Sequence, residues 1–261
     1  MNQPLAYIHP GAKIEQNVVV EPFTTIHNNV EIGAGTWIGS NVTIMEGARI
    51  GKNCRIFPGA VISAIPQDLK FEGEDSLVVI GDNVTIRECV TVNRGTKAHG
   101  KTEIGDNCLI MATVHIAHDC IIGNNAILVN GVLLAGHVTI GEYAIIGGLA
   151  GIHQFIHIGK HAMVSGGSLV RKDVPPFSKA AKEPLSYVGI NSIGLRRRGF
   201  ESKKIHEIQN IFRVLYQKKN NTSQAVGIIE AEFEATTERD TILQFIRNSQ
   251  RGIMKGYSSG N

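Results

Sequence analysis

The short segment "VHIAHDC", residues 114–120, combines two histidines with an aspartate in a chain otherwise rich in Ile, Val, Gly and Asn. His115 and His118 stand three residues apart, and Asp119 follows directly. Such a group allows three interpretations: ligands of a metal ion, a general base with a supporting carboxylate, or positions in a structural stack without chemistry. The elements that place these side chains decide between them.

A six-residue repeat dominates the sequence. An Ile, Leu or Val recurs at every sixth position over residues 8–62, 80–92 and 104–170, and the residue four positions later is usually small or β-branched. This period fits neither a 3.6-residue helix nor the two-residue alternation of a strand, but it fits a parallel β-helix whose short strands are joined by corners. We therefore predict a mainly β protein with these two positions stacked inside the solenoid.

Two segments interrupt the repeat, residues 63–79 and 97–103, and loops that leave a rigid scaffold commonly carry function. The repeat ends at the two prolines of "DVPPF", which cannot continue it. Beyond that point the apolar residues follow helical spacing, as in Ile205, Ile208, Phe212, Leu215 and Tyr216. We predict a β-helix over residues 1–182 and a small α-helical domain over residues 183–261 that caps its open end.

The composition is that of a soluble globular protein, with 43% hydrophobic and 19% charged residues. The first residues show no basic segment followed by an apolar one, and no window approaches ~18 consecutive apolar residues, so we expect a cytoplasmic protein without a membrane span. Three of the four cysteines, Cys54, Cys108 and Cys120, stand at the small inward position of the repeat. We expect them to be structural, because no CxxC pair indicates zinc.

A basic zone covers residues 171–219, where twelve Lys and Arg stand against four Asp and Glu, although the whole chain carries a formal net charge of only +3. Zones of this kind usually meet phosphates or an acidic partner.

The repeat also predicts which polar residues meet. If three hexads make one coil, residues 18 apart lie above one another at the strand spacing of about 4.8 Å. Histidines that are distant in sequence then converge on neighbouring columns. These columns are His118–Gly136–Gln154, Asp119–His137 and Ala135–His153.

The predicted columns contain the parts of an acyl transfer. His118 can take a proton from an attacking hydroxyl, Asp119 can fix its tautomer, and Gly136 exposes an N–H to a developing oxyanion. No Ser or Cys stands in the column, which favours direct transfer over a covalent enzyme intermediate. We place His115 at a corner, in a structural or supporting role, where it and His118 do not both point outward to share a metal ion. A purely structural stack stays an alternative.

The sequence also resembles a known family. The segments "HIAHDC", "AGHVTI", "AIIGGLAGIHQF", "DVPPF" and "GLRRRGF", with "QDLKFEGE" and "VNRGT" in the two interruptions, look like those of the UDP-N-acetylglucosamine 3-O-acyltransferases. These enzymes begin lipid A biosynthesis in Gram-negative bacteria. The resemblance covers nearly the whole chain. It implies a left-handed β-helix and a homotrimer with active sites between subunits. We expect neither a cofactor nor a metal ion.

The resemblance implies that an (R)-3-hydroxyacyl group moves from acyl carrier protein to the 3-hydroxyl of UDP-N-acetylglucosamine. His118 matches the general base, Asp119 its orienting partner and Gly136 the oxyanion donor. Gly166 matches the far end of the acyl groove, where a bulkier residue would shorten the accepted chain, so glycine implies a long acyl group. The substrate-contacting matches are Asp68, Lys70, His137, His153 and Gln154, with Asn191, Arg197 and Arg198 for the nucleotide and its phosphates.

Two positions depart from the family pattern. Asn93 stands where relatives often carry His, which removes a titratable ring but keeps hydrogen bonding. Ile193 stands where relatives often carry Glu, which removes one polar contact to the nucleotide. Neither departure touches the predicted base.

The expected partners are acyl carrier protein, whose acidity suits the basic zone, and UDP-N-acetylglucosamine, with no nucleic acid. Three rival functions stay open. The nearest is N-acylation of a UDP-3-O-acylglucosamine, although that family usually carries a domain before its first hexapeptides and here the repeat begins by Ile8. The others are a zinc-binding β-helix of the carbonic-anhydrase type and a non-catalytic scaffold. The preferred acyl length is not predicted.

Overall fold

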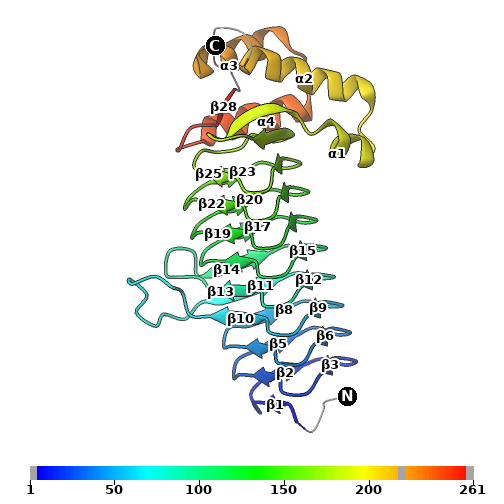
Figure 1. The fold of residues 1–261 in the computed structure, drawn as a ribbon, viewed down its shortest axis with the longest axis vertical. Coiled ribbons are helices and arrows are strands. Elements are labelled where there is room, and N and C mark those ends of the chain that lie inside the picture. Colours follow the sequence, from blue (N-terminus) through cyan, green and yellow to red (C-terminus); the bar gives the residue numbers. More distant parts are fainter. Residues whose placement is uncertain (1–4, 217–220, 257–261) are drawn as a thin grey trace.

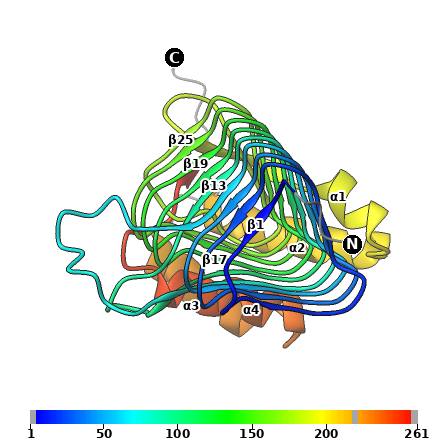
Figure 2. The same cartoon turned by 90° about the horizontal axis from the view of Figure 1, so that it is seen from below.

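A computed structural model describes residues 5–216 and 221–256 of the chain, which wind into a left-handed parallel β-helix under a helical cap (Figure 1). An uninterrupted coil takes 18 residues, since Tyr7 pairs with Thr25 and Thr25 pairs with Thr43. Seen along its axis, the solenoid has a triangular outline (Figure 2). The fold class predicted from the six-residue repeat is therefore confirmed.

Three sheets form the faces of the prism, and we number them in the order in which the chain visits them. The first sheet has nine strands: β1 (Tyr7–Ile8), β4 (Thr25–Ile26), β7 (Thr43–Ile44), β10 (Val61–Ala64), β13 (Thr91–Asn93), β16 (His115–Ile116), β19 (Leu133–Leu134), β22 (Gly151–Ile152) and β25 (Leu169–Val170).

The second sheet has eight strands: β2 (Lys13–Ile14), β5 (Glu31–Ile32), β8 (Ala48–Ile50), β11 (Leu77–Ile80), β14 (Lys101–Ile104), β17 (Ile121–Ile122), β20 (Thr139–Ile140) and β23 (His157–Ile158). The third sheet has eleven: β3 (Val19–Val20), β6 (Trp37–Ile38), β9 (Arg55–Ile56), β12 (Thr85–Ile86), β15 (Leu109–Ile110), β18 (Ile127–Leu128), β21 (Ile145–Ile146), β24 (Met163–Val164), β26 (Ser178–Ala181), β27 (Ser186–Ile190) and β28 (Lys255–Gly256).

The interior of the prism is filled by the residues that define the repeat. Ile26, Ile44 and Ile62 lie above one another and are fully buried. The inward cysteines are buried as expected, and burial raises the pKa of Cys108 to about 11 and that of Cys120 to about 12. These thiols are therefore protonated packing groups at neutral pH.

The prism has three edges, and the edge between the first and second sheets holds the "VHIAHDC" segment. We call it the first edge; the second edge joins the second and third sheets, and the third edge leads back to the first sheet. The third residue of most corners adopts a left-handed backbone, which Asn tolerates well, as Asn17 and Asn125 show. Asp119 and His137 occupy this same position at the first edge, with φ of 58° and 60°.

Both interruptions of the repeat leave the coil at the first edge. Residues 65–76 connect β10 to β11, and residues 94–100 connect β13 to β14. The longer connection projects from one corner of the triangle (Figure 2). It is held at its base by Asn93, whose Nδ2 donates to the Ile65 carbonyl over 3.1 Å.

The C-terminal part closes the prism. β26 adds a partial coil by pairing with β24, and β27 returns antiparallel to it, so the first helix begins at Ser192 and not near residue 183. The helices are α1 (Ser192–Arg197), α2 (Ser202–Tyr216), α3 (Thr222–Glu232) and α4 (Thr237–Asn248). Within the described ranges, no helix has both the length and the hydrophobicity needed to cross a bilayer.

Candidate active site

A cleft of about 840 Å³ opens at the first edge and extends over the outer face of the first sheet. Its polar end combines His118 and Gly136 with Asp68 from the connection 65–76. Its floor is apolar, because Leu133 and Leu169 are 56% and 48% exposed there. A cleft with a polar end and an apolar floor suits a substrate that has a polar part and an apolar part.

His118 and Asp119 form a hydrogen-bonded pair at the polar end. His118 Nδ1 lies 2.8 Å from Asp119 Oδ2, and both residues are buried in the chain. Asp119 is ionised over the neutral range, so it accepts this bond and fixes the tautomer with Nδ1 protonated. Nε2 of His118 then carries a lone pair and can accept a proton. Asp68 Oδ2 lies 4.0 Å from this nitrogen.

The Asp119 carboxylate has further donors in Thr96. The Thr96 N–H donates to Oδ1 over 3.0 Å, and the Thr96 hydroxyl donates to Oδ2 over 2.7 Å. Burial raises the pKa of Asp119, but the bonds from His118 and Thr96 and the nearby His137 ring outweigh it, so this pKa lies below its usual value. The carboxylate is therefore stabilised in its charged form.

His137 lies beside the pair. Its Nε2 is 3.7 Å from Asp119 Oδ2, and its ring stands edge-on to His118 with centroids 5.1 Å apart. Phe155 stacks on its other side at 4.6 Å, and His99 from the connection 94–100 lies 5.5 Å away. Burial, more than any other cause, lowers the pKa of His137, so this ring is neutral at neutral pH.

Gly136 lies directly against the His118 ring. A Cβ at Gly136 would stand 2.6 Å from His118 Cε1 and 2.7 Å from Nε2, so only glycine leaves room for this imidazole. Its carbonyl accepts from the Phe155 N–H, whereas its own N–H has no hydrogen-bond partner among the described residues. A free backbone N–H beside a base is suited to stabilising an oxyanion.

The remaining residues predicted at this end also line the cleft: Asp68, Lys70, His153 and Gln154. Asp68 accepts the Lys70 N–H over 3.0 Å within its loop, and His153 Nδ1 contacts the Gln154 carbonyl at 3.1 Å. The 18-residue register thus brings together the predicted columns and one loop within a single chain.

The predicted nucleotide residues lie elsewhere, at the second edge. Asn191 caps α1 and donates from Nδ2 to the His161 carbonyl, while Arg198 Nη2 donates to the Tyr143 carbonyl over 3.0 Å. Arg197 is exposed on α1, and Ile193 is 62% exposed. Figure 2 shows α1 beside a different corner from the projecting connection 65–76. One chain therefore does not unite these residues with His118.

Gly166 lies at the third edge, where the strands of the first sheet begin. Those strands cross the apolar floor of the cleft and end at the first edge, so Gly166 stands at the far side of the floor from His118. A Cβ at this position would lie 3.1 Å from the Gly148 carbonyl oxygen, so a side chain fits there only if this neighbour shifts slightly.

His115 does not stand at a corner as predicted. It belongs to strand β16, and because side chains alternate along a strand, it points outward when Ile116 points inward. It lines the cleft together with His118, so the prediction that the two do not both point outward was wrong. Its Nδ1 lies 2.7 Å from the Thr91 hydroxyl, and burial lowers its pKa.

Possible ligand atoms of His118, Asp119 and His137 lie within 4.8 Å of one another, a spacing that a metal ion accepts. Asp119 Oδ2 already receives hydrogen bonds from His118 and Thr96. A metal ion there would have to replace both bonds, so the arrangement fits the pairing of a base with a carboxylate better than a ligand set.

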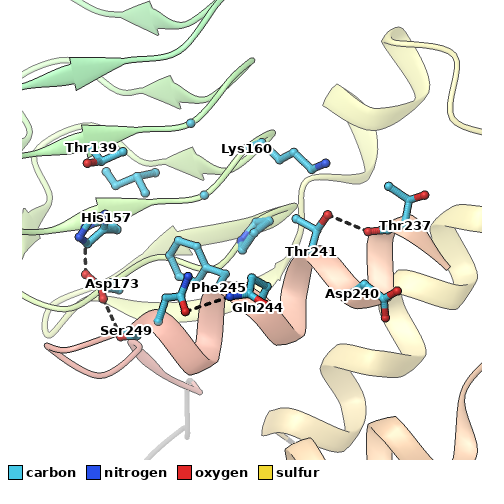
Figure 3. Close-up of a pocket in the computed structure, with 15 residues that line it drawn as sticks. Thr139, His157, Lys160, Asp173, Thr237, Asp240, Thr241, Gln244, Phe245 and Ser249 are labelled. Carbon is cyan, nitrogen blue, oxygen red and sulfur yellow. Dashed lines mark hydrogen bonds between the residues drawn. The ribbon is translucent and has the colours of Figure 1, made fainter. Parts of the chain in front are cut away.

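A second cleft, of about 830 Å³, lies between the second sheet and α4 (Figure 3). Asp173 ties its two walls together, since its carboxylate accepts from the His157 N–H at 2.9 Å and from the Ser249 hydroxyl at 2.6 Å. None of the described residues predicted for chemistry lines this cleft. It is the seam where the helical cap sits on the coil.

Four neighbours of Asp119 and His137 were not predicted from the sequence: Thr96, Thr102, His99 and Phe155. Thr96 belongs to the "VNRGT" segment and stands just before an interruption of the repeat, which was an available signal. Phe155 could have been predicted from the 18-residue register, because it continues the column of Asp119 and His137.

Family models match three parts of the chain. Residues 173–254 match "Udp N-acetylglucosamine O-acyltransferase; Domain 2", residues 101–136 match "Bacterial transferase hexapeptide (six repeats)", and residues 2–101 match "GMPPB C-terminal domain".

Curated and solved relatives resemble the chain along almost its full length. An acyl-[acyl-carrier-protein]–UDP-N-acetylglucosamine O-acyltransferase of Chlorobaculum parvum is 54% identical, over 98% of each chain. A solved UDP-N-acetylglucosamine acyltransferase of Bacteroides fragilis is 50% identical with a TM-score of 0.96, over 98% of this chain and 100% of its own. That of Francisella novicida is 42% identical with a TM-score of 0.96, over 99% and 95%.

Proposed function

The chain belongs to the acyl-[acyl-carrier-protein]–UDP-N-acetylglucosamine O-acyltransferase family, and from this premise we propose that it transfers a 3-hydroxyacyl group from acyl carrier protein to the 3-hydroxyl of UDP-N-acetylglucosamine. The observation that carries this proposal is the His118–Asp119 pair beside the free Gly136 N–H, at the polar end of a cleft with an apolar floor. That arrangement supplies a base, an oxyanion donor and a place for an acyl chain.

The chemistry follows from the geometry of the pair. Nε2 of His118 takes the proton of the sugar 3-hydroxyl as the oxygen attacks the thioester carbonyl carbon. Asp119 stabilises the imidazolium, and the Gly136 N–H donates to the oxyanion. The tetrahedral intermediate collapses, the C–S bond breaks, and His118 returns the proton to the leaving thiolate. The products are an ester and the free thiol, with no bond to the protein.

Incubation with an acyl carrier protein thioester and either UDP-N-acetylglucosamine or UDP-3-O-acylglucosamine separates the two acyltransferase functions. We expect acylation of the first acceptor and none of the second, because the family is that of O-acyltransferases. Acylation of the 2-amine of the second acceptor alone would make the chain an N-acyltransferase.

We propose that the working form is a homotrimer. In one chain Asn191 and Arg198 lie at the second edge, and only a neighbouring subunit could bring such residues to the first edge, where His118 lies. Arg198 suits a diphosphate because its guanidinium presents a planar pair of donors. We expect light scattering to give the mass of three copies of the 28.3-kDa chain, and a monomer with full activity would contradict this assembly.

The acyl donor is the proposed partner of the basic zone. Arg171 lines the cleft together with His153, and Lys172 is the next residue, so an acidic carrier approaching the cleft meets positive charge. Lys218 and Lys219 of this zone lie outside the described residues. A cytoplasmic location is part of the same proposal.

Gly166 is proposed to limit the length of the acyl chain. We expect Gly166→Met to shift the preferred donor toward shorter acyl chains, because its side chain would occupy the far side of the apolar floor. Competition assays with thioesters of graded length measure this preference, and Gly166→Ala should give a smaller shift in the same direction. An unchanged preference in Gly166→Met would remove this residue from chain-length selection.

A further inference from the structure

Two threonines, Thr96 in the connection 94–100 and Thr102 in β14, both contact Asp119. Thr96 donates twice to the Asp119 carboxylate, and Thr102 Oγ1 accepts the Asp119 N–H over 2.8 Å. Thr96 is 7% exposed, Thr102 is fully buried and Asp119 is 2% exposed, so water does not compete for these bonds. The segment 96–102 is thus fastened to Asp119 at both of its ends.

The direction of the Thr96 hydroxyl bond is fixed by its other neighbour. The Ala98 N–H points at Thr96 Oγ1 over 3.2 Å and can only donate, so it uses a lone pair of the hydroxyl oxygen. The single hydroxyl proton is then free for Asp119 Oδ2, which can only accept. The Thr96 carbonyl also accepts the Gly100 N–H over 2.7 Å, which closes the turn. Thr96 is therefore held from its own loop while it holds the carboxylate.

Without the Thr96 hydroxyl, Asp119 Oδ2 would keep only His118 as a hydrogen-bond donor among the described residues. His137 Nε2 lies 3.7 Å from the same oxygen, so the carboxylate has a competing direction in which to turn. Bonds to a charged acceptor are the strong ones, and a carboxylate with one fewer donor is also easier to protonate.

We propose that Thr96 is a positioning residue of the acyl transfer, which acts by holding the Asp119 carboxylate ionised and aimed at His118 Nδ1, with Thr102 anchoring the Asp119 backbone. This inference rests on the proposed function, because it assigns a role within that reaction. Thr96 lies behind Asp119 and does not line the cleft, so it affects turnover and not substrate binding.

The test replaces Thr96 by Val, which has the same shape and keeps the backbone N–H bond to Oδ1. We expect kcat to fall about 10- to 100-fold, with KM within about twofold of the wild type, and Thr96→Ser to restore most of the activity. Thr36→Val is the matched control. Thr36 is buried like Thr96, and its hydroxyl donates to the Gly51 carbonyl and accepts the Cys54 N–H, several coils from the site.

The pH profile gives a second readout that a merely structural role would not move. Loss of a donor raises the pKa of Asp119, so the part of the acid-side loss of kcat that comes from protonating this carboxylate should begin at a higher pH in Thr96→Val but not in Thr36→Val. The charged and titratable groups around the pair are Asp68, Lys70, His99, His115, His137, His153 and Arg171.

Three results would overturn the proposal: wild-type kcat in Thr96→Val, equal losses in Thr96→Val and Thr96→Ser, or an equal loss in Thr36→Val. If Thr96→Val does not fold, Thr96→Cys replaces it, because a thiol is a weak donor; wild-type kcat in that variant contradicts the role. A wild-type chain without transferase activity would reject the proposed function itself. An active wild type with an equally active Thr96→Val rejects only the inference.

Discussion

Replacing His118 by Ala should reduce kcat/KM by about 10²–10⁴-fold and leave the fold intact. The loss follows from the position of Nε2, which is the only described imidazole nitrogen at this edge whose ring is tied to Asp119 through its other nitrogen. His137 cannot replace it, because its own Nε2 faces Asp119 at 3.7 Å. The rates of acyl carrier protein thiol release by wild type and variant measure the effect.

His27→Ala is the control for this substitution. His27 lies just after β4 in the N-terminal coils, and its backbone N–H donates to the Ile44 carbonyl, which the substitution preserves. We expect it to retain wild-type activity. A His118→Ala protein that is folded, as judged by circular dichroism, and fully active would require a different base.

Gly136→Ala should reduce the rate by about 10²-fold or more, although it adds one methyl group. The new Cβ would stand 2.6 Å from His118 Cε1, closer than van der Waals contact allows, so the imidazole must swing away. It then loses the 2.8 Å bond to Asp119 and its alignment with the acceptor hydroxyl. Steady-state kinetics should show the loss mainly in kcat, since the apolar floor of the cleft is unchanged.

The matched control is Gly227→Ala in α3. A Cβ there would meet no atom within 4 Å, and alanine favours the helix, so activity should be unchanged and stability equal or higher. A Gly136→Ala enzyme as active as Gly227→Ala would show that the imidazole has room to move without leaving its working position.

The fold was predictable because one periodicity describes most of it. A solenoid repeats the same local environment, so the spacing of Ile, Leu and Val fixes both the coil length and the inward face. The same register predicted the column of His118 and Gly136 and that of Asp119 and His137, which the structure places side by side. Predicting which residues stack 18 positions apart required no knowledge of tertiary contacts.

Features outside the repeat were not predictable in the same way. The bonds from Thr96 to Asp119 depend on how residues 94–100 fold back on the coil, and no period constrains that loop. His115 was misplaced because its position within the hexad was counted as a corner, whereas hydrogen bonding extends the strand to include it. Helices also begin later than expected, since the antiparallel pair of β26 and β27 precedes them.

The most direct test of the account is to locate the acyl group in the product made by the wild-type protein. After incubation with a 3-hydroxyacyl thioester of acyl carrier protein and UDP-N-acetylglucosamine, NMR of the purified product identifies the acylated position, and intact mass spectrometry examines the protein. We expect an ester at the sugar 3-oxygen and a protein of unchanged mass. No acylated sugar, an amide product, or an acyl group retained on the protein would contradict direct transfer by His118.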